Sequence, residues 1–132
     1  MATITRLEDL EIWQLARVFA TDIGRVVDGS SFDMETGLRN QMKNSSGSAM
    51  DNIAEGFGRG SKHEFVNYLT IANGSAEECR SQLYRSLDRK LIDKACFEDL
   101  LQQAVVLVKR ITALINYLNR STIKGNKFKD RQ

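Results

Sequence analysis

Apolar residues recur along most of this chain at steps of three and four, the spacing that places side chains on one face of an α-helix. Polar or glycine-containing segments interrupt the repeat near residues 28–33, 58–61 and 90–93. Because these segments are short, consecutive helices are expected to pack side by side in opposite directions. The pattern predicts an all-α fold, an antiparallel up-and-down four-helix bundle. Its helices are expected at residues 9–27, 34–57, 62–89 and 94–119.

The composition and the end of the apolar repeat both support one helical domain. The 132 residues include no proline, so no residue breaks a long helix by removing a backbone donor. This length is sufficient for a single hydrophobic core. We expect residues 1–119 to form the bundle and residues 120–132 to form a flexible basic tail, because the repeat stops after Asn119.

A glycine-rich segment separates the second and third predicted helices. Gly56, Gly58 and Gly60 occupy alternate positions, and glycine tolerates the backbone angles that a helix end requires. These three glycines are therefore expected to end the second helix. Ser61 and Glu64 have the spacing of a capping box, in which the serine hydroxyl accepts from the Glu64 N–H and the glutamate accepts from the Ser61 N–H. A hairpin of two helices about this turn is predicted.

The second predicted helix has an unusually polar middle. Residues 44–48 are Asn-Ser-Ser-Gly-Ser, which form helices poorly on their own, so tertiary packing must hold this helix. In a hairpin, its polar side chains can face those of the third helix and fix the register. We interpret Glu55 as a buried member whose removal costs a few kcal/mol. This polar seam comprises Gln41, Asn52, Glu55, Glu78 and Gln82, and the same two faces carry Asn44, Ser48, Ser75 and Arg85.

Two apolar features suggest contact with another chain. Val105 and Val106 widen the apolar face of the fourth helix beyond what one core needs, and a helix that is apolar on more than one side usually packs twice. Trp13 lies off the centre of the first helix's apolar face. It either packs at the edge of the core or anchors a subunit contact. A homo-oligomer is therefore expected.

Positive charge is concentrated at the C-terminal end. The chain has a net charge of +2, but residues 120–132 carry five basic residues and one acidic residue, which leaves −2 for the first 119. A basic tail favours phosphate contacts with RNA or DNA. Basic residues also flank the polar seam, although any solvated helix face carries such charges. The candidate nucleic-acid-binding residues are Arg39, Lys43, Arg59, Lys62, Arg120, Lys124, Lys127, Lys129 and Arg131.

No catalytic, metal or cofactor site is expected. The segment from Gly56 to Lys62 fails as a phosphate loop, because its lysine follows the serine and a helix precedes it. The single histidine, His63, cannot supply the paired Glu-x-x-His motifs of a bundle metal site or a hydrolase triad. An enzyme that uses Glu55 and Glu78 is the alternative.

The two cysteines are predicted to be reduced and buried. Cys79 and Cys96 fall at apolar positions of their helices. If these helices turn near Leu91, the two positions are offset by seven residues, roughly 10 Å of helix rise. That separation is too large for a disulfide.

The chain shows no sign of membrane targeting. Arg6, Glu8, Asp9 and Glu11 stand where a signal peptide needs an apolar run. No apolar stretch approaches the roughly 18 residues that span a bilayer. We expect a cytoplasmic protein that has no membrane partner.

Several motifs together are similar to one known family. They are Leu10-x-x-Trp13-Gln14, Gly37-Leu38-x-x-Gln41, the Asn52–Arg59 block and the series from Phe65-x-x-Tyr68-Leu69 to Gln82-Leu83. They resemble the four-helix bundle family of small bacterial proteins often encoded in intervening sequences of the 23S ribosomal RNA gene. The resemblance extends to about Leu118. Residues 44–48 depart from it, because the family more often has basic residues and alanine there.

The resemblance implies an assembly and a range of functions. The family is similar in architecture to accessory proteins of diversity-generating retroelements, which implies a homo-pentamer with a central channel. For the family itself, RNA or DNA binding is the usual conjecture. We therefore expect a non-enzymatic, homo-oligomeric bundle that binds RNA through electrostatic phosphate contacts. The alternative is a protein-interaction scaffold or accessory subunit that has no nucleic-acid affinity of its own.

Overall fold

The computed structural model describes residues 3–121 and shows an all-α chain with no strand in that range. Each long helix agrees with its expected range to within two residues at either end. Residues 122–132, most of the predicted basic tail, lie outside the described residues, and Arg120 ends the last helix. The elements are η1 (Leu7–Asp9), α1 (Glu11–Val27), η2 (Ser30–Phe32), α2 (Thr36–Arg59), α3 (Lys62–Asp88) and α4 (Lys94–Arg120).

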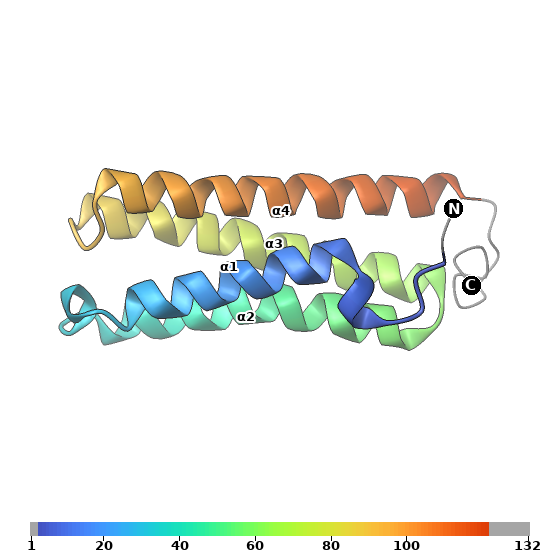
Figure 1. The fold of residues 1–132 in the computed structure, drawn as a ribbon, viewed down its shortest axis with the longest axis horizontal. Coiled ribbons are helices and arrows are strands. Elements are labelled where there is room, and N and C mark those ends of the chain that lie inside the picture. The colour runs from blue at the N-terminus through green and yellow to red at the C-terminus, as the bar shows by residue number, and fades with distance from the viewer. Residues whose placement is uncertain (1–2, 122–132) are drawn as a thin grey trace.

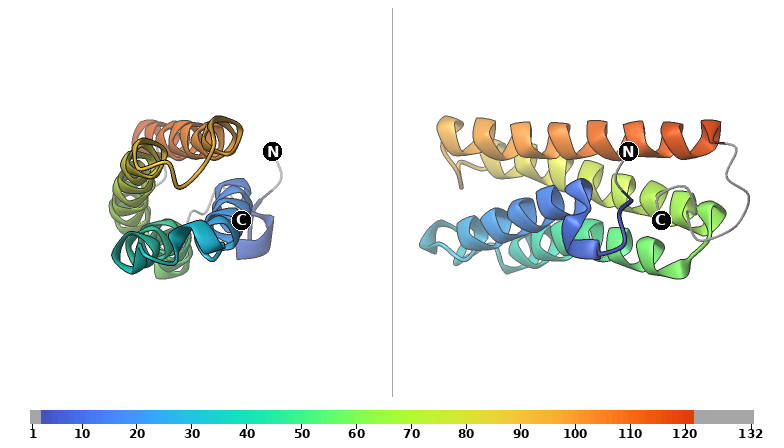
Figure 2. Two further views of the ribbon diagram at one scale, coloured as in Figure 1. Left: turned by 90° about the vertical axis from the view of Figure 1, so that its left-hand side faces the viewer. Right: turned by 45° about the vertical axis from the view of Figure 1, so that its right-hand side comes forward.

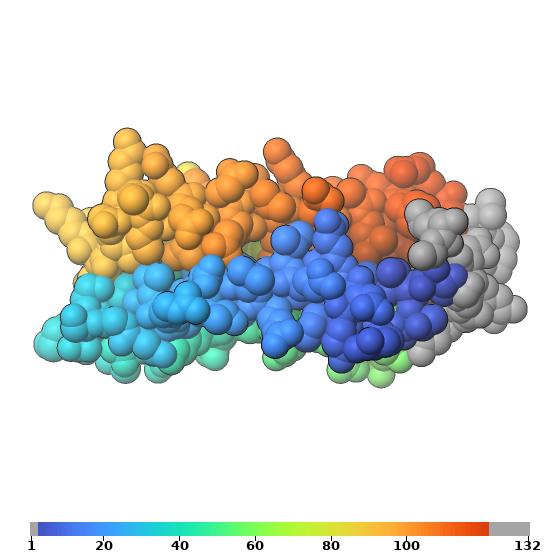
Figure 3. Space-filling model, in the orientation of Figure 1, coloured from blue at the N-terminus to red at the C-terminus, as the bar shows by residue number. Residues whose placement is uncertain are grey.

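The four long helices run up and down along one axis (Figures 1 and 2). Each helix packs against the next one in sequence, and α1 also contacts α4. The pairing of α2 with α3 is the most extensive. In the space-filling view, α1 and the segment before it cover the front of the bundle, with α4 above them (Figure 3). The described chain is therefore an antiparallel four-helix bundle, as the sequence predicts.

One contiguous hydrophobic core runs along the bundle axis, and every long helix contributes to it. Phe19 of α1, Phe65 of α3 and Ile111 of α4 are fully buried, as is Phe32 of η2, which closes one end. Trp13 packs at the edge of this core, with the Arg17 guanidinium 5.6 Å from the centroid of its ring. No helix within the described range is both long enough and apolar enough to cross a membrane.

The end of α2 differs from the sequence prediction. The helix continues through Gly56 and Gly58 to Arg59, and only Gly60 takes a left-handed conformation, with φ of 91°. A glycine inside a helix costs about 1 kcal/mol, which tertiary packing can offset. Gly56 has such a packing reason, because a Cβ there would lie 2.6 Å from the Cβ of Tyr68. The prediction that all three glycines end the helix is wrong, since Gly56 serves close approach and Gly60 alone serves the turn.

The capping box at the start of α3 forms in part. The Ser61 hydroxyl accepts a hydrogen bond from the Glu64 backbone N–H at 3.2 Å, which confirms Ser61 as the N-cap. The Glu64 carboxylate accepts from the Ser61 hydroxyl, also at 3.2 Å, instead of from the Ser61 N–H. The turn is therefore fixed by a side-chain pair on α3 and by one left-handed glycine.

Both cysteines are free thiols, but only one is buried. Burial raises the pKa of the Cys79 thiol to about 11, although its contact with Ser45 acts in the opposite direction. Cys96 is half-buried because it lies in the first turn of α4, at the end of the bundle. The expectation of two buried thiols is therefore wrong for Cys96.

The close approach at Gly56 gives a direct test of this packing. Gly56→Ala should lower the free energy of unfolding by about 1–3 kcal/mol, because the new methyl group collides with Tyr68. Gly47→Ala in the same helix is the matched control, because its added Cβ meets nothing within 4 Å. The control should raise stability by about 0.5–1 kcal/mol. Urea unfolding measures both, and a Gly56→Ala protein as stable as the parent would contradict the packing.

Candidate nucleic-acid interface

The basic residues predicted to flank the polar seam do not form one surface. Arg39 and Arg59 lie twenty residues apart on α2, about 30 Å along the helix. Arg39 and Lys43 are near the connection between α1 and α2, whereas Arg59 and Lys62 are at the opposite end. The structure therefore divides the four residues into two pairs, which corrects the expected single flank.

Arg39 supports the fold at its end of the bundle. Its Nε donates to the carbonyl of Val27 at 3.1 Å, and its Nη2 donates to the carbonyl of Phe32 at 3.0 Å. Only 24% of the side chain is exposed. A cation that bonds the last carbonyl of a helix satisfies an orphan acceptor and opposes the negative end of the helix dipole. Arg39 is therefore a cap for α1, a role that the sequence pattern did not reveal.

Lys43 is also paired within the chain. Its Nζ lies 2.6 Å from a carboxylate oxygen of Asp28, just after α1. Both side chains are exposed, so the pair is worth at most about 1 kcal/mol. The charge of Lys43 is thus already balanced by a neighbour at the end of the bundle away from the tail.

At the opposite end of the bundle, the start of α3 meets the end of α4. The Lys62 ammonium donates to the carbonyl of Ser121 at 3.3 Å, which joins the start of α3 to the end of α4. Arg120 is the last residue of α4. Ser121, the last described residue, therefore lies beside Lys62, and the candidate residues Lys124, Lys127, Lys129 and Arg131 lie outside the described range.

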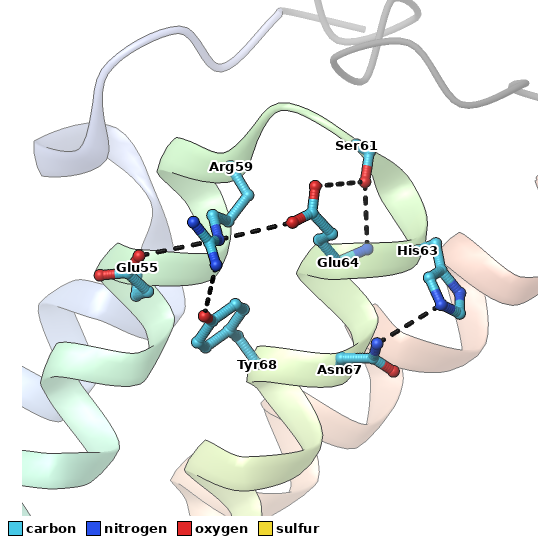
Figure 4. A network of polar contacts seen from close by, with 7 residues as sticks. All are labelled: Glu55, Arg59, Ser61, His63, Glu64, Asn67 and Tyr68. Carbon is cyan, nitrogen blue, oxygen red and sulfur yellow. Dashed lines mark hydrogen bonds and ion pairs between the residues drawn. The ribbon is translucent and has the colours of Figure 1, made fainter.

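Arg59 is the centre of a polar cluster at this end (Figure 4). Its Nη2 donates to the Tyr68 hydroxyl at 2.9 Å, and its guanidinium carbon lies 5.3 Å from the ring centroid of Tyr68. Its Nε is 3.7 Å from Glu55 and 3.5 Å from Glu64. The hydrogen bond that Arg59 donates to Tyr68 is the largest influence that raises the pKa of Arg59, so the side chain is always cationic. Arg59 thus lies between two carboxylates and over one aromatic ring.

The sequence analysis did not identify this role of Tyr68. Tyr68 follows Glu64 by one helical turn, so both side chains lie on the same side of α3 and face the end of α2. The i, i+4 spacing of Glu64 and Tyr68 is the feature of the sequence that could have predicted their shared contact with Arg59.

The polar seam exists, but with different members at its centre. Gln82 is buried and its Oε1 accepts a hydrogen bond from the Ser45 hydroxyl at 2.7 Å. Such buried pairs hold helices in register, because breaking one leaves an unsatisfied group. The other contacts between or along α2 and α3 are Arg85 to Gln41 at 3.0 Å, Ser48 with Ser75 at 2.8 Å, Asn52 to the Ser48 carbonyl at 2.8 Å and Ser86 to the Met42 sulfur at 3.3 Å.

The two glutamates of the predicted seam, Glu55 and Glu78, do not take part in these contacts between α2 and α3. The Glu55 side chain is 54% exposed and contacts Arg59, and Glu78 is exposed. The interpretation of Glu55 as a buried residue is therefore wrong. The physical reason is the rotation of α2, which turns Ser45 and Ala49 toward the interior and leaves Glu55 at the rim. Among residues 3–121, no three histidine, cysteine, aspartate or glutamate side chains are grouped so as to hold a metal ion.

Comparison with known proteins gives a family and a fold. The family model described as 23S rRNA-intervening sequence protein matches residues 8–113, which include parts of all four helices. A crystal structure of a protein of unknown function from the S23 ribosomal protein family of Bacteroides thetaiotaomicron aligns with a TM-score of 0.72 and 21% identity. The alignment covers 79% of this chain and 97% of that one, and at this identity it shows the shared fold alone. No curated protein matches the chain.

Because Glu55 is exposed and Gln82 is buried, replacing them should have different effects on the free energy of unfolding. Glu55→Ala should change the free energy of unfolding by less than about 0.5 kcal/mol, because it removes one exposed ion pair. Gln82→Ala should lower it by about 1–3 kcal/mol, because the buried Ser45 hydroxyl loses the shorter of its two hydrogen bonds and keeps only the one to the Met42 carbonyl at 3.3 Å. Chemical denaturation of both variants provides the measurement. Equal losses for the two would place Glu55 among the buried contacts between α2 and α3 after all.

Proposed function

This chain belongs to the 23S rRNA-intervening sequence protein family, and on that premise we propose that it is a non-enzymatic protein that binds structured RNA through phosphate contacts. The observation that carries the proposal is the contact between Lys62 and Ser121. This contact joins Lys62, at the start of α3, to the residue that follows Arg120, at one end of the bundle. Phosphate contacts of this kind are independent of base sequence.

The charge distribution also favours this end of the bundle as the location of the phosphate contacts. The last 13 residues carry a net charge of +4 in a chain whose remainder is −2. Each lysine or arginine that neutralises a phosphate releases a condensed counterion, which drives binding and makes it depend on salt. At the other end, Arg39 is only 24% exposed and Lys43 is paired with the Asp28 carboxylate. We therefore assign the phosphate contacts to Lys62, Arg120 and the tail.

Salt dependence of RNA binding tests this assignment. The test variant combines Lys124→Gln, Lys127→Gln, Lys129→Gln and Arg131→Gln, and its binding to a labelled RNA hairpin is followed by fluorescence anisotropy across a salt series. Its slope of log affinity against log salt should be shallower by as much as about 3–4, close to one unit per lost contact. Lys43→Gln, at the opposite end, is the control and should keep the parent slope.

Two results would count against the proposal. An unchanged slope in the fourfold variant would exclude the tail as the contact. No binding by the parent chain at low salt would favour the alternative of a protein-interaction scaffold.

We also propose that copies of the chain assemble through the face between α1 and α4. Val18 is 55% exposed there, and with Leu15 and Val106 it lines a shallow hollow of about 230 Å³. Val105 and Val106 are only half-buried, so the wide apolar face of α4 is not fully covered by its own chain. Apolar surface that a monomer leaves open favours association. The family resemblance points to five subunits.

A single substitution tests this contact. Val18→Glu should shift the mass seen in sedimentation velocity toward that of one chain, because a charge in an apolar interface is costly to desolvate. Met34→Glu is the matched control, since Met34 is 93% exposed near the connection between α1 and α2. A parent protein that sediments as a single chain at micromolar concentration would contradict the assembly.

A further inference from the structure

We propose that the Arg59 guanidinium, held over Tyr68, is a stacking platform for one unpaired base of the bound RNA. The inference rests on the proposed function and adds to it a site that distinguishes unpaired from paired nucleotides. Unpaired bases in RNA are commonly recognised by stacking on aromatic rings or on arginine planes.

The geometry leaves one part of Arg59 available. The guanidinium carbon lies over the Tyr68 ring at 5.3 Å from its centroid, and Nη2 donates to the Tyr68 hydroxyl at 2.9 Å. The Nε edge faces Glu55 on one side and Glu64 on the other (Figure 4). The side chain is still 45% exposed. A planar group that is held by three partners and still partly exposed is already oriented for stacking.

The local charge disfavours a phosphate at this position. Arg59 contributes +1, whereas Glu55 and Glu64 contribute −1 each, so the three together carry −1. A phosphate would have to displace a carboxylate from the Arg59 Nε edge and would be repelled by both. A base is neutral and needs only the exposed part of the plane, so it leaves the existing contacts intact. The expected phosphate contact by Arg59 is therefore replaced by stacking.

The platform lies where a bound strand would pass. Arg59 ends α2, Lys62 begins α3, and Lys62 contacts the residue that follows α4. Phosphates bound by Lys62 and Arg120 would bring neighbouring nucleotides close to the platform. A paired base already has both faces stacked within the duplex. RNA with a single-stranded extension is therefore expected to bind better than the same hairpin with a blunt end.

A fluorescent base analogue gives a direct measure of stacking. The probe is an RNA hairpin whose loop is replaced by a non-nucleotide linker, with a short 3′ extension that contains 2-aminopurine, whose emission is quenched when it stacks. The parent protein should quench this emission on binding. Arg59→Lys keeps the charge but loses the plane, so quenching should disappear. Its affinity for the extended hairpin should fall by on the order of tenfold, whereas its affinity for the blunt hairpin should not change.

Controls separate this inference from the proposed function. Arg85→Lys changes an exposed arginine that bonds Gln41 farther along the same helix pair, and it should behave as the parent does. Thermal unfolding of each variant confirms that it is folded. If the parent binds the extended hairpin without quenching, or if Arg59→Lys quenches equally, the platform is wrong and phosphate binding stands. If the parent binds neither RNA at low salt, both proposals are overturned.

Discussion

The close approach of α2 and α3 is the constraint on which the rest of the structure depends. Small residues on α2 allow it, because Gly56 lies directly against Tyr68 and the Ser48 and Ser75 hydroxyls meet between the helices. The buried Ser45–Gln82 bond then penalises any slip of one helix along the other. A helix whose middle is Asn-Ser-Ser-Gly-Ser has little stability of its own, so this pairing is also what keeps α2 helical.

The register of this pair determines the candidate site. The series of contacts from Gln41 and Arg85 to Ser48 and Ser75 continues to the turn, where it places Arg59 over Tyr68. The same turn directs Lys62 to the end of α4. Phosphate binding and base stacking are both proposed for this end of the bundle. The residues proposed for them are positioned by the hydroxyl and amide contacts between α2 and α3, which lie farther along the helices.

The sequence was sufficient for the fold class but not for the details of the site. Long apolar repeats such as those of α1 and α4 identify helices and their buried faces with little ambiguity. On α2 the apolar repeat is weaker and a polar stripe runs beside it. One residue corresponds to a rotation of about 100°, so a small error in the orientation of α2 exchanges a buried position for one at the rim. This is why Ser45 of α2 makes the buried contact with Gln82 while Glu55 lies at the surface. The roles of Arg39 and Tyr68 depend on contacts between segments, which no local pattern contains.

The contacts of Arg39 couple local unfolding at the end of α1 to the start of α2. Helix α1 ends at Val27 without a left-handed glycine, and the carbonyl of Val27 is bonded by a side chain that belongs to α2. The same guanidinium bonds the carbonyl of Phe32, whose ring closes that end of the core. Fraying of the last turn of α1 therefore requires α2 to release Arg39. In hydrogen exchange, the end of α1, the Phe32 turn and the start of α2 should behave as one cooperative opening unit, instead of as a loop that fluctuates alone.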